Sequence, residues 1–228
     1  MSPHPAGLSD RVIAAVGLAR EARIAESEQV HAVIGGGDEA GLAESLQRAV
    51  AQGASGIISF GIAGGLDPKL QPGTCIVGSA VSEGNQRWRT DVAWAKNLLA
   101  ALPHAVFAEI TGVDRPVATV EHKRLLRSMT GAAAVDMESH VAGRMAADVG
   151  LPFAILRVIC DPAGRSLPPA ALAGMRRDGK TDTGAVLMNV LTQPSQLFAM
   201  IGLAGDARVA FSELKRRRKS AGPGFALG

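Results

Sequence analysis

Residues 134–161 read AVDMESHVAGRMAADVGLPFAILRVICD, and this stretch predicts both the fold class and a site. Two carboxylates, Asp136 and Glu138, precede a helical run that ends at a glycine. The apolar run Phe153 to Ile159 then has the character of a buried strand, with Asp161 at its carboxyl end. Ligands of α/β sheets bind at the carboxyl ends of strands, so the three acids are expected near one rim. Acids at a helix start also complement the helix dipole, and this purely structural interpretation stays open for the first two.

The size and charge of the chain indicate one α/β domain. The 228 residues are 47% hydrophobic and contain no long low-complexity linker, so we expect a single core over residues 11–214. Residues 1–10 are predicted to be a flexible lead-in, and 215–228 a basic tail containing Gly and Pro. The net charge of +3 depends on the five cations of Lys215 to Lys219, without which the balance is negative. The body is therefore not basic, and no nucleic-acid partner is predicted.

Several classes of protein are excluded by what the sequence contains. Cys75 and Cys160 lie far apart in apolar runs, which indicates buried, reduced thiols in a cytoplasmic protein. The histidines and cysteines have no metal-ligand spacing, so neither a metal nor a cofactor is expected. The N-terminus lacks the pattern of a secretory signal, and no apolar run is long enough to span a membrane.

Apolar runs and periodicity predict the elements. Expected strands and helices alternate along the first part of the chain, and helices alone follow. Besides the helical run before Gly150 and the strand 153–159, the expected strands are 11–18, 30–34, 56–60, 75–81, 106–111 and 116–120, and the expected helices are 39–52, 121–129, 170–177, 184–192, 195–203 and 206–219. Glycine stretches follow two of the strands, at 35–37 and 61–65. The first mimics a dinucleotide fingerprint, but the next strand supplies no acid for a ribose, so a dinucleotide is rejected. A turn is expected at the second, and the two together predict a pocket for a neutral or weakly anionic ligand.

Four short motifs carry a family resemblance. They are Gly17 to Glu21, Ile62-Ala63-Gly64-Gly65-Leu66, Val135-Asp136-Met137-Glu138 and Ile159-Cys160-Asp161. These segments resemble the superfamily of purine nucleoside phosphorylases and methylthioadenosine/S-adenosylhomocysteine nucleosidases, over about residues 11–215. Within it, the segments GLAREARIA, GGGD, SFGIAGGLDP, VDMES and GKTDT are most similar to bacterial hopanoid-associated phosphorylases. The resemblance implies a single-domain phosphorylase/hydrolase-like fold, a twisted mixed β-sheet flanked by helices, and at least a homodimer.

The resemblance also implies roles for individual residues. Asp161 would protonate N7 of a departing purine, and Glu21 would hold and activate the attacking water. Glu138 would bind the ribose 2′- and 3′-hydroxyls. The other expected substrate-binding residues surround the sugar: Met137 beneath it, Asp136 and Ala63 within the motifs, and Gly64 and Gly35 on the side of the nucleophile. Apart from the resemblance, this chemistry suits breakage of an N-ribosidic bond, which leaves positive charge on the sugar and negative charge on the base.

Departures from the family pattern leave the nucleophile open. Ile62 and Cys160 stand where the nucleosidases have serines, and phosphorolytic relatives often have an arginine and a serine around the glycine turn. Phosphate would therefore need another cation here, for which Arg20, Arg23 and Arg157 are candidates. Hydrolysis and phosphorolysis both remain possible interpretations.

The substrate implied by the hopanoid branch is adenosylhopane, from which adenine would be released in hopanoid biosynthesis. The alternative is a general methylthioadenosine or S-adenosylhomocysteine nucleosidase. A third interpretation, from another class, is a non-catalytic nucleoside-binding protein on the same fold. The cations Lys215 to Lys219 are expected either to be a solvated helix end or to touch anionic lipid at the inner membrane face, where a hopanoid substrate would reside.

Overall fold

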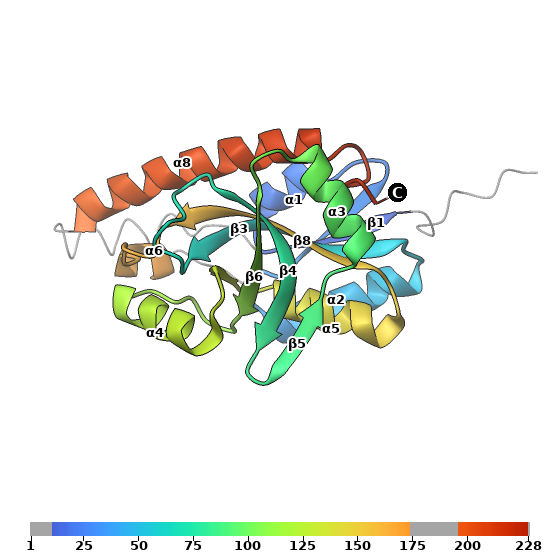
Figure 1. Cartoon of the computed structure of the whole chain (residues 1–228), viewed down its shortest axis with the longest axis horizontal. Helices are drawn as coiled ribbons and strands as arrows, with labels where there is room; N and C mark the ends of the chain where they lie inside the picture. Colours follow the sequence, from blue (N-terminus) through green and yellow to red (C-terminus); the bar gives the residue numbers. More distant parts are fainter. Residues whose placement is uncertain (1–10, 174–195, 228) are drawn as a thin grey trace, which may run out of the picture.

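The computed structural model describes residues 11–173 and 196–227, which form an α/β fold with an eight-stranded mixed sheet between helices (Figure 1). The strands are β1 (Val12–Val16), β2 (Val30–Ile34), β3 (Gly56–Gly65), β4 (Cys75–Glu83), β5 (Gln86–Arg89), β6 (Val106–Gly112), β7 (Ala134–Asp136) and β8 (Phe153–Asp161). The helices are α1 (Ala19–Ala25), α2 (Glu39–Ala51), α3 (Val92–Ala101), α4 (Val120–Thr130), α5 (Ser139–Val149), α6 (Pro169–Ala173) and α8 (Gln196–Ser220). The predicted fold class is confirmed.

Part of the sheet closes on itself. β2, β1, β3 and β8 pair in parallel, and β8 then pairs antiparallel with β4. β4 and β6 are parallel, as are β6 and β7, and β7 returns to β3 as a short antiparallel pair. The strands β3, β8, β4, β6 and β7 therefore form a closed ring, and β2 and β5 are the edges of the sheet outside it. The ring also brings the ends of β3, β7 and β8 together.

Helices cover both faces because side chains alternate along the strands. In β1, Val12, Ala14 and Val16 pack in the core under α3 and α8, whereas Ile13 and Ala15 pack in the core under α2 and α5. Figure 1 shows α8 crossing one face while α2 and α5 lie on the other. In the part of the chain that the structure describes, no helix combines the length and apolar character that a membrane span needs.

Several elements differ from their predicted extents. Residues 61–65 continue β3 instead of forming a turn, because Gly64 and Gly65 pair with Val135 and Ala134 of β7. The strand predicted at 116–120 is wrong, since residues 113–119 are irregular and α4 begins at Val120. β5 was not predicted. The two last predicted helices, 195–203 and 206–219, are one helix, α8, while 184–192 and the end of 170–177 lie outside the described residues.

The C-terminal residues are part of the packed core. A separate tail is expected from residue 215, but α8 runs on to Ser220 and the chain then folds back, burying Phe225 completely. The Phe225 ring lies edge-on to Phe60 at 5.0 Å, and its carbonyl accepts a 2.7 Å hydrogen bond from Trp94 Nε1. The Arg218 guanidinium lies 4.3 Å from the ring centroid and is itself buried. The charged and Gly/Pro-containing composition of residues 215–228 predicted a solvated tail, but these long-range contacts pack the segment against the core.

Phe225→Ala is expected to lower the free energy of unfolding by about 3 kcal/mol or more, because it leaves a cavity against Phe60. The control is Phe107→Ala, since that side chain is 54% exposed and its loss leaves no cavity. Equilibrium denaturation of both variants checks this. Equal, small losses in the two variants would show that the C-terminal segment does not stabilise the fold.

Candidate active site

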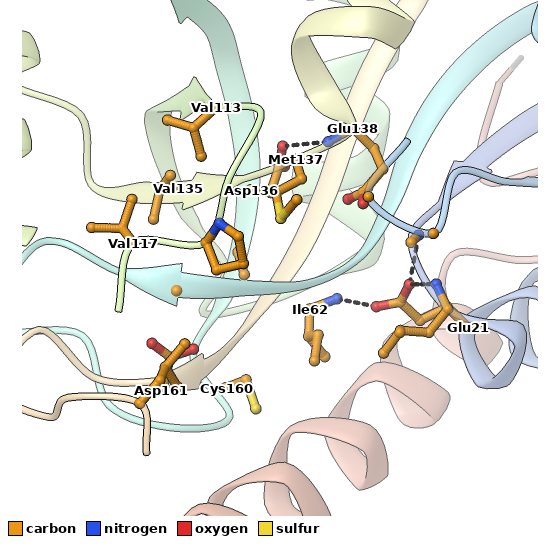
Figure 2. A pocket seen from close by; sticks show the side chains of 18 residues that line it. Glu21, Ile62, Val113, Val117, Val135, Asp136, Met137, Glu138, Cys160 and Asp161 are labelled. Carbon is orange, nitrogen blue, oxygen red and sulfur yellow. Dashed lines mark hydrogen bonds between the residues drawn. The ribbon is translucent and has the colours of Figure 1, made fainter. Parts of the chain in front are cut away.

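A cavity of about 170 Å³ opens where β1, β3, β7 and β8 end (Figure 2). The glycine loop after β2 and the irregular segment 113–119 complete its wall. Much of the lining is apolar, including Ile62, Val113 and Val135. Four acids also line it: Glu21, Asp136, Glu138 and Asp161. The cavity therefore brings together the three acids that the sequence placed at strand ends and a fourth from the start of α1.

The acids on one side depend on a buried guanidinium. Arg157 of β8 is 0% exposed, and its Nε lies 2.8 Å from Asp136 Oδ2. Its Nη2 contacts Glu138 Oε2 at 3.1 Å and Ser59 Oγ at 2.6 Å. An unpaired charge in such a core would be very costly, so Arg157 requires these partners. Arg157 is thus committed to ion pairs and is not in the cavity lining, which removes it as a phosphate ligand.

Asp136 and Glu138 are held differently. Asp136 Oδ1 accepts hydrogen bonds from the backbone N–H groups of Glu138 and Ser139, which fixes the start of α5. The structural and the site interpretations of this pair are therefore compatible. Burial, partly offset by Arg157 and assisted by Asp136 and Glu21, raises the pKa of Glu138 to about 7. A Cβ on Gly17 would lie 2.7 Å from Glu138 Oε1, so glycine is needed there for the carboxyl group to fit.

Glu21 is fixed by backbone donors. Its carboxylate accepts from the N–H groups of Gly17 (2.9 Å), Leu18 (2.8 Å) and Ile62 (2.7 Å), as the dashed lines in Figure 2 show. Gly61 has φ 153°, and a Cβ there would lie 2.5 Å from Glu21 Oε1, so the glycine admits the carboxylate. Burial raises the pKa of Glu21, while Arg157 and the three N–H groups act in the opposite direction.

Asp161 reaches the cavity through an irregularity in the sheet. Ile159 pairs with Ala63 and Asp161 pairs with Gly64, so Cys160 is an extra residue in β8. Such a bulge re-aims the side chains beside it, which explains how the consecutive Cys160 and Asp161 both line the cavity. Burial raises the pKa of the Cys160 thiol to about 12, so this cysteine stays protonated near neutral pH and is a poor nucleophile.

Lys123 is a site residue that the sequence did not reveal. It is 0% exposed on α4, and its Nζ lies 2.5 Å from Asp161 Oδ2. The same ammonium donates to the carbonyls of Pro162 (3.0 Å) and Arg165 (2.9 Å), so its three donors are used. Burial raises the pKa of Asp161, and Lys123 lowers it in part. In sequence, Lys123 is one of several cations on an exposed-looking helix, and only its spacing of three from Leu126 hinted at an inward face.

Three of the four remaining predicted residues line the cavity, and one does not. Met137, Ala63 and Gly64 line it, and Met137 points into it in Figure 2. Gly35 does not: it packs beside Leu42 and Glu138, and the next two glycines, 36 and 37, line the wall instead. Gly35 was expected there because sequence alone could not say which glycine of the loop faces inward.

The other candidate phosphate ligands lie elsewhere. Arg20 and Arg23 are exposed on α1, and Arg20 stacks 4.0 Å from the centroid of the Phe211 ring. Neither contributes to the cavity lining. Among the described residues, the lining contains no lysine, arginine or histidine, and the nearby cations Arg157 and Lys123 are both paired with its carboxylates.

Comparisons with known proteins agree with this architecture. The family model described as "Phosphorylase superfamily" matches residues 29–192. The methylthioadenosine/S-adenosylhomocysteine nucleosidase of Neisseria meningitidis, solved with methylthio-immucillin-A, superposes with a TM-score of 0.66 at 15% identity, covering 92% of this chain and 97% of that one. Futalosine hydrolase of Helicobacter pylori superposes with 0.61 at 16% identity, covering 92% and 98%. A search of curated proteins gave no match.

The raised pKa of Glu138 predicts a specific pH dependence of stability. A carboxyl group whose pKa rises from 4.5 to about 7 on folding stabilises the fold fully below 4.5, and this contribution is lost as the pH rises through 7. Glu138→Gln should therefore reduce the fall in unfolding free energy between about pH 5 and about pH 8, by an amount of the order of 1–3 kcal/mol.

Denaturant titrations at the two pH values measure this difference. The control is Glu44→Gln, whose parent side chain is 69% exposed and pairs only with Arg48, so it should behave as the wild type does. If wild type and Glu138→Gln lose the same stability over this range, Glu138 does not carry the raised pKa.

Proposed function

This chain belongs to the phosphorylase superfamily, and we propose that it hydrolyses the N-ribosidic bond of a 5′-substituted adenosine, releasing adenine. The observation that carries the choice of water over phosphate is the charge of the cavity. Its described lining has four carboxyl groups and no cation. Phosphate sites use charge-assisted donors, and the described lining offers none to a phosphate dianion. Any ionised carboxylate in the lining would also repel the dianion. A neutral nucleoside and a water molecule meet no such barrier.

Asp161 is assigned the leaving-group side. When the bond between C1′ and the purine nitrogen breaks, its electron pair goes to the base, which a proton at N7 then neutralises. Burial favours the protonated form of Asp161, and the 2.5 Å contact with Lys123 Nζ fixes where the carboxyl group points. Lys123 is thereby a positioning residue, which also keeps the pKa from rising as far as burial alone would take it.

Glu21 and Glu138 are assigned the sugar side. In Figure 2 they lie together, on the opposite side of the view from Asp161. In their ionised forms these carboxylates stabilise the positive charge that develops on the ribose ring. Glu21 takes a proton from the attacking water as the water oxygen bonds to C1′, and its three backbone donors hold it in place for this. Glu138 accepts hydrogen bonds from the ribose hydroxyls, and Met137 packs against the ring.

The 5′ substituent is proposed to be apolar. Val117, Pro116 and Leu167 supply apolar surface to the cavity wall, which suits adenosylhopane. The alternative is a thioether nucleoside, since the nucleosidase from Neisseria meningitidis was solved in complex with methylthio-immucillin-A. Either substrate needs the same three carboxyl groups, so the two proposals differ only at the mouth of the cavity.

The setting of the enzyme is a further part of the proposal. We propose a homodimer or larger homo-oligomer, as the family resemblance implies, in the cytoplasm, as the buried thiols indicate. The lipid contact suggested by the basic run would depend on Lys215 and Lys219, which are exposed. Arg216 and Arg217 both pair with Glu213 and Arg218 is buried, so two cations are available in place of five. The electrostatic attraction to anionic headgroups is weaker by that ratio.

Incubation with methylthioadenosine and with adenosylhopane, each with and without phosphate, tests the reaction. We expect adenine and a free reducing sugar at a rate that phosphate does not change, followed by mass. Asp161→Asn should lower adenine release by about 10²–10⁴-fold, because the base loses its proton donor. Asp148→Asn is the control, since that side chain is exposed on α5. A sugar 1-phosphate as the product would refute hydrolysis, and undiminished turnover by a folded Asp161→Asn would refute the assigned acid.

Lys123→Met is expected to move the alkaline limb of the pH profile of kcat/KM. The ammonium favours ionised Asp161, so its removal raises the pKa of that carboxyl group and keeps it protonated to higher pH. The limb should shift upward by about one pH unit or more. Lys96→Met, at an exposed position of α3, should leave the profile unchanged. An unshifted limb in folded Lys123→Met would mean that Asp161 is not the group titrating there.

A further inference from the structure

A second cluster of ionisable side chains lies outside the cavity. Glu39 begins α2, Glu83 ends β4, Asp114 follows β6 and His140 lies in the first turn of α5. One carboxylate oxygen from each acid and one ring nitrogen of His140 all lie within 4.8 Å of one another. The four residues are far apart in the chain, which is why the sequence predicted no metal site.

His140 distinguishes this cluster from an ordinary group of surface acids. Its side chain is completely buried, and neither Nδ1 nor Nε2 has a hydrogen-bond partner among the described residues. Nε2 points at the acids, 3.4 Å from Asp114 Oδ1 and 3.6 Å from Glu83 Oε1. Gly112 leaves room for the ring, since a Cβ there would lie 2.3 Å from Nδ1. Buried polar atoms are rarely left without a partner, so this nitrogen indicates a ligand.

The charge of the cluster is also unbalanced. Arg144 contacts Glu39 at 2.5 Å and Glu83 at 3.6 Å. This single guanidinium therefore accompanies a cluster of three carboxylates, those of Glu39, Glu83 and Asp114. Carboxylates this close repel one another unless a proton or a cation lies between them. The separations of 3.4 and 3.6 Å between His140 Nε2 and the acids are too long for good hydrogen bonds, so the acids do not satisfy this nitrogen. A bound cation would neutralise part of the negative charge and would also give His140 Nε2 a partner.

We propose that His140, Glu39, Glu83 and Asp114 bind one divalent transition-metal ion. His140 Nε2 would supply a nitrogen ligand and the three acids oxygen ligands, a donor set that suits Mn²⁺ or Zn²⁺. Ligands about 2.1 Å from one ion lie at most about 4.2 Å apart, so a set within 4.8 Å needs to contract only slightly. Arg144 would remain beside the site as a partner of Glu39.

The position of this ion would connect it to the cavity without placing it in the reaction. Asp114 belongs to the segment 113–119, whose Val113, Pro116 and Val117 line the cavity. Glu39 follows the glycine loop directly, and His140 is two residues from Glu138. An ion shared by these elements holds both cavity loops against the start of α5. Its role is therefore structural, and it deepens the proposed function only by fixing the walls of the pocket.

The experiment uses the full chain, stripped with a chelator and then titrated with MnCl₂ or ZnCl₂. We expect binding of about one ion per chain by calorimetry, a rise in Tm, and for Mn²⁺ a change in its paramagnetic resonance signal. Asp114→Asn should weaken binding by about tenfold or more, because it removes a charged ligand from an exposed position where folding is not at risk. Glu44→Gln, an exposed acid on α2, is the matched control.

The outcomes separate this proposal from the proposed reaction. Asp161→Asn should bind the ion normally, since Asp161 lies outside the cluster. Absence of stoichiometric binding, or equal affinity in wild type and Asp114→Asn, would overturn the metal site, whatever the chain does to nucleosides. Loss of adenine release with intact metal binding would instead count against the reaction alone.

Discussion

The burial of the Arg157 guanidinium is the constraint on which the site depends. Its place in the middle of β8 leaves no access to water, so the neighbouring elements must supply carboxylates. Asp136 and Glu138 do so from the end of β7 and the start of α5, and Glu21 lies close enough to interact with the same charge. One cation then serves three acids. Burial, together with the neighbouring charges of Asp136 and Glu21, raises the pKa of Glu138 to about 7, and burial raises that of Glu21.

The second buried cation divides the cavity into two environments. Lys123 of α4 pairs with Asp161 at the end of β8, whereas Arg157 in the middle of β8 pairs with Asp136 and Glu138. Separate environments for two carboxyl groups allow one to act as an acid while another stays ionised. The same pairing leaves no described cation free at the cavity wall. Both buried cations of the site, Arg157 and Lys123, are thus paired with acids and cannot bind an anionic nucleophile. This favours a neutral nucleophile.

Glycines make these close approaches possible. Gly17 and Gly61 admit the carboxyl groups of Glu138 and Glu21 where any Cβ would clash. Backbone N–H groups at Gly17, Leu18 and Ile62 then satisfy Glu21. The glycine stretch at 61–65, which looks like a turn in the sequence, is a strand in which Gly61 admits the Glu21 carboxylate and Gly64 and Gly65 pair with β7.

The sequence by itself determined the α/β class and the strands at 30–34 and 153–159, and it predicted candidate site acids at 21, 138 and 161. Alternation, apolar runs and short motifs are local, so they can be seen along the chain. Only the tertiary structure decided the closure of the strand ring, the packing of Phe225 on Phe60, and the partners of Arg157, Lys123 and His140. Lys123 and Asp161 are 38 residues apart, and no periodicity relates them. Such contacts depend on which faces meet in space, because a buried charge takes its partner from whatever element the fold places beside it.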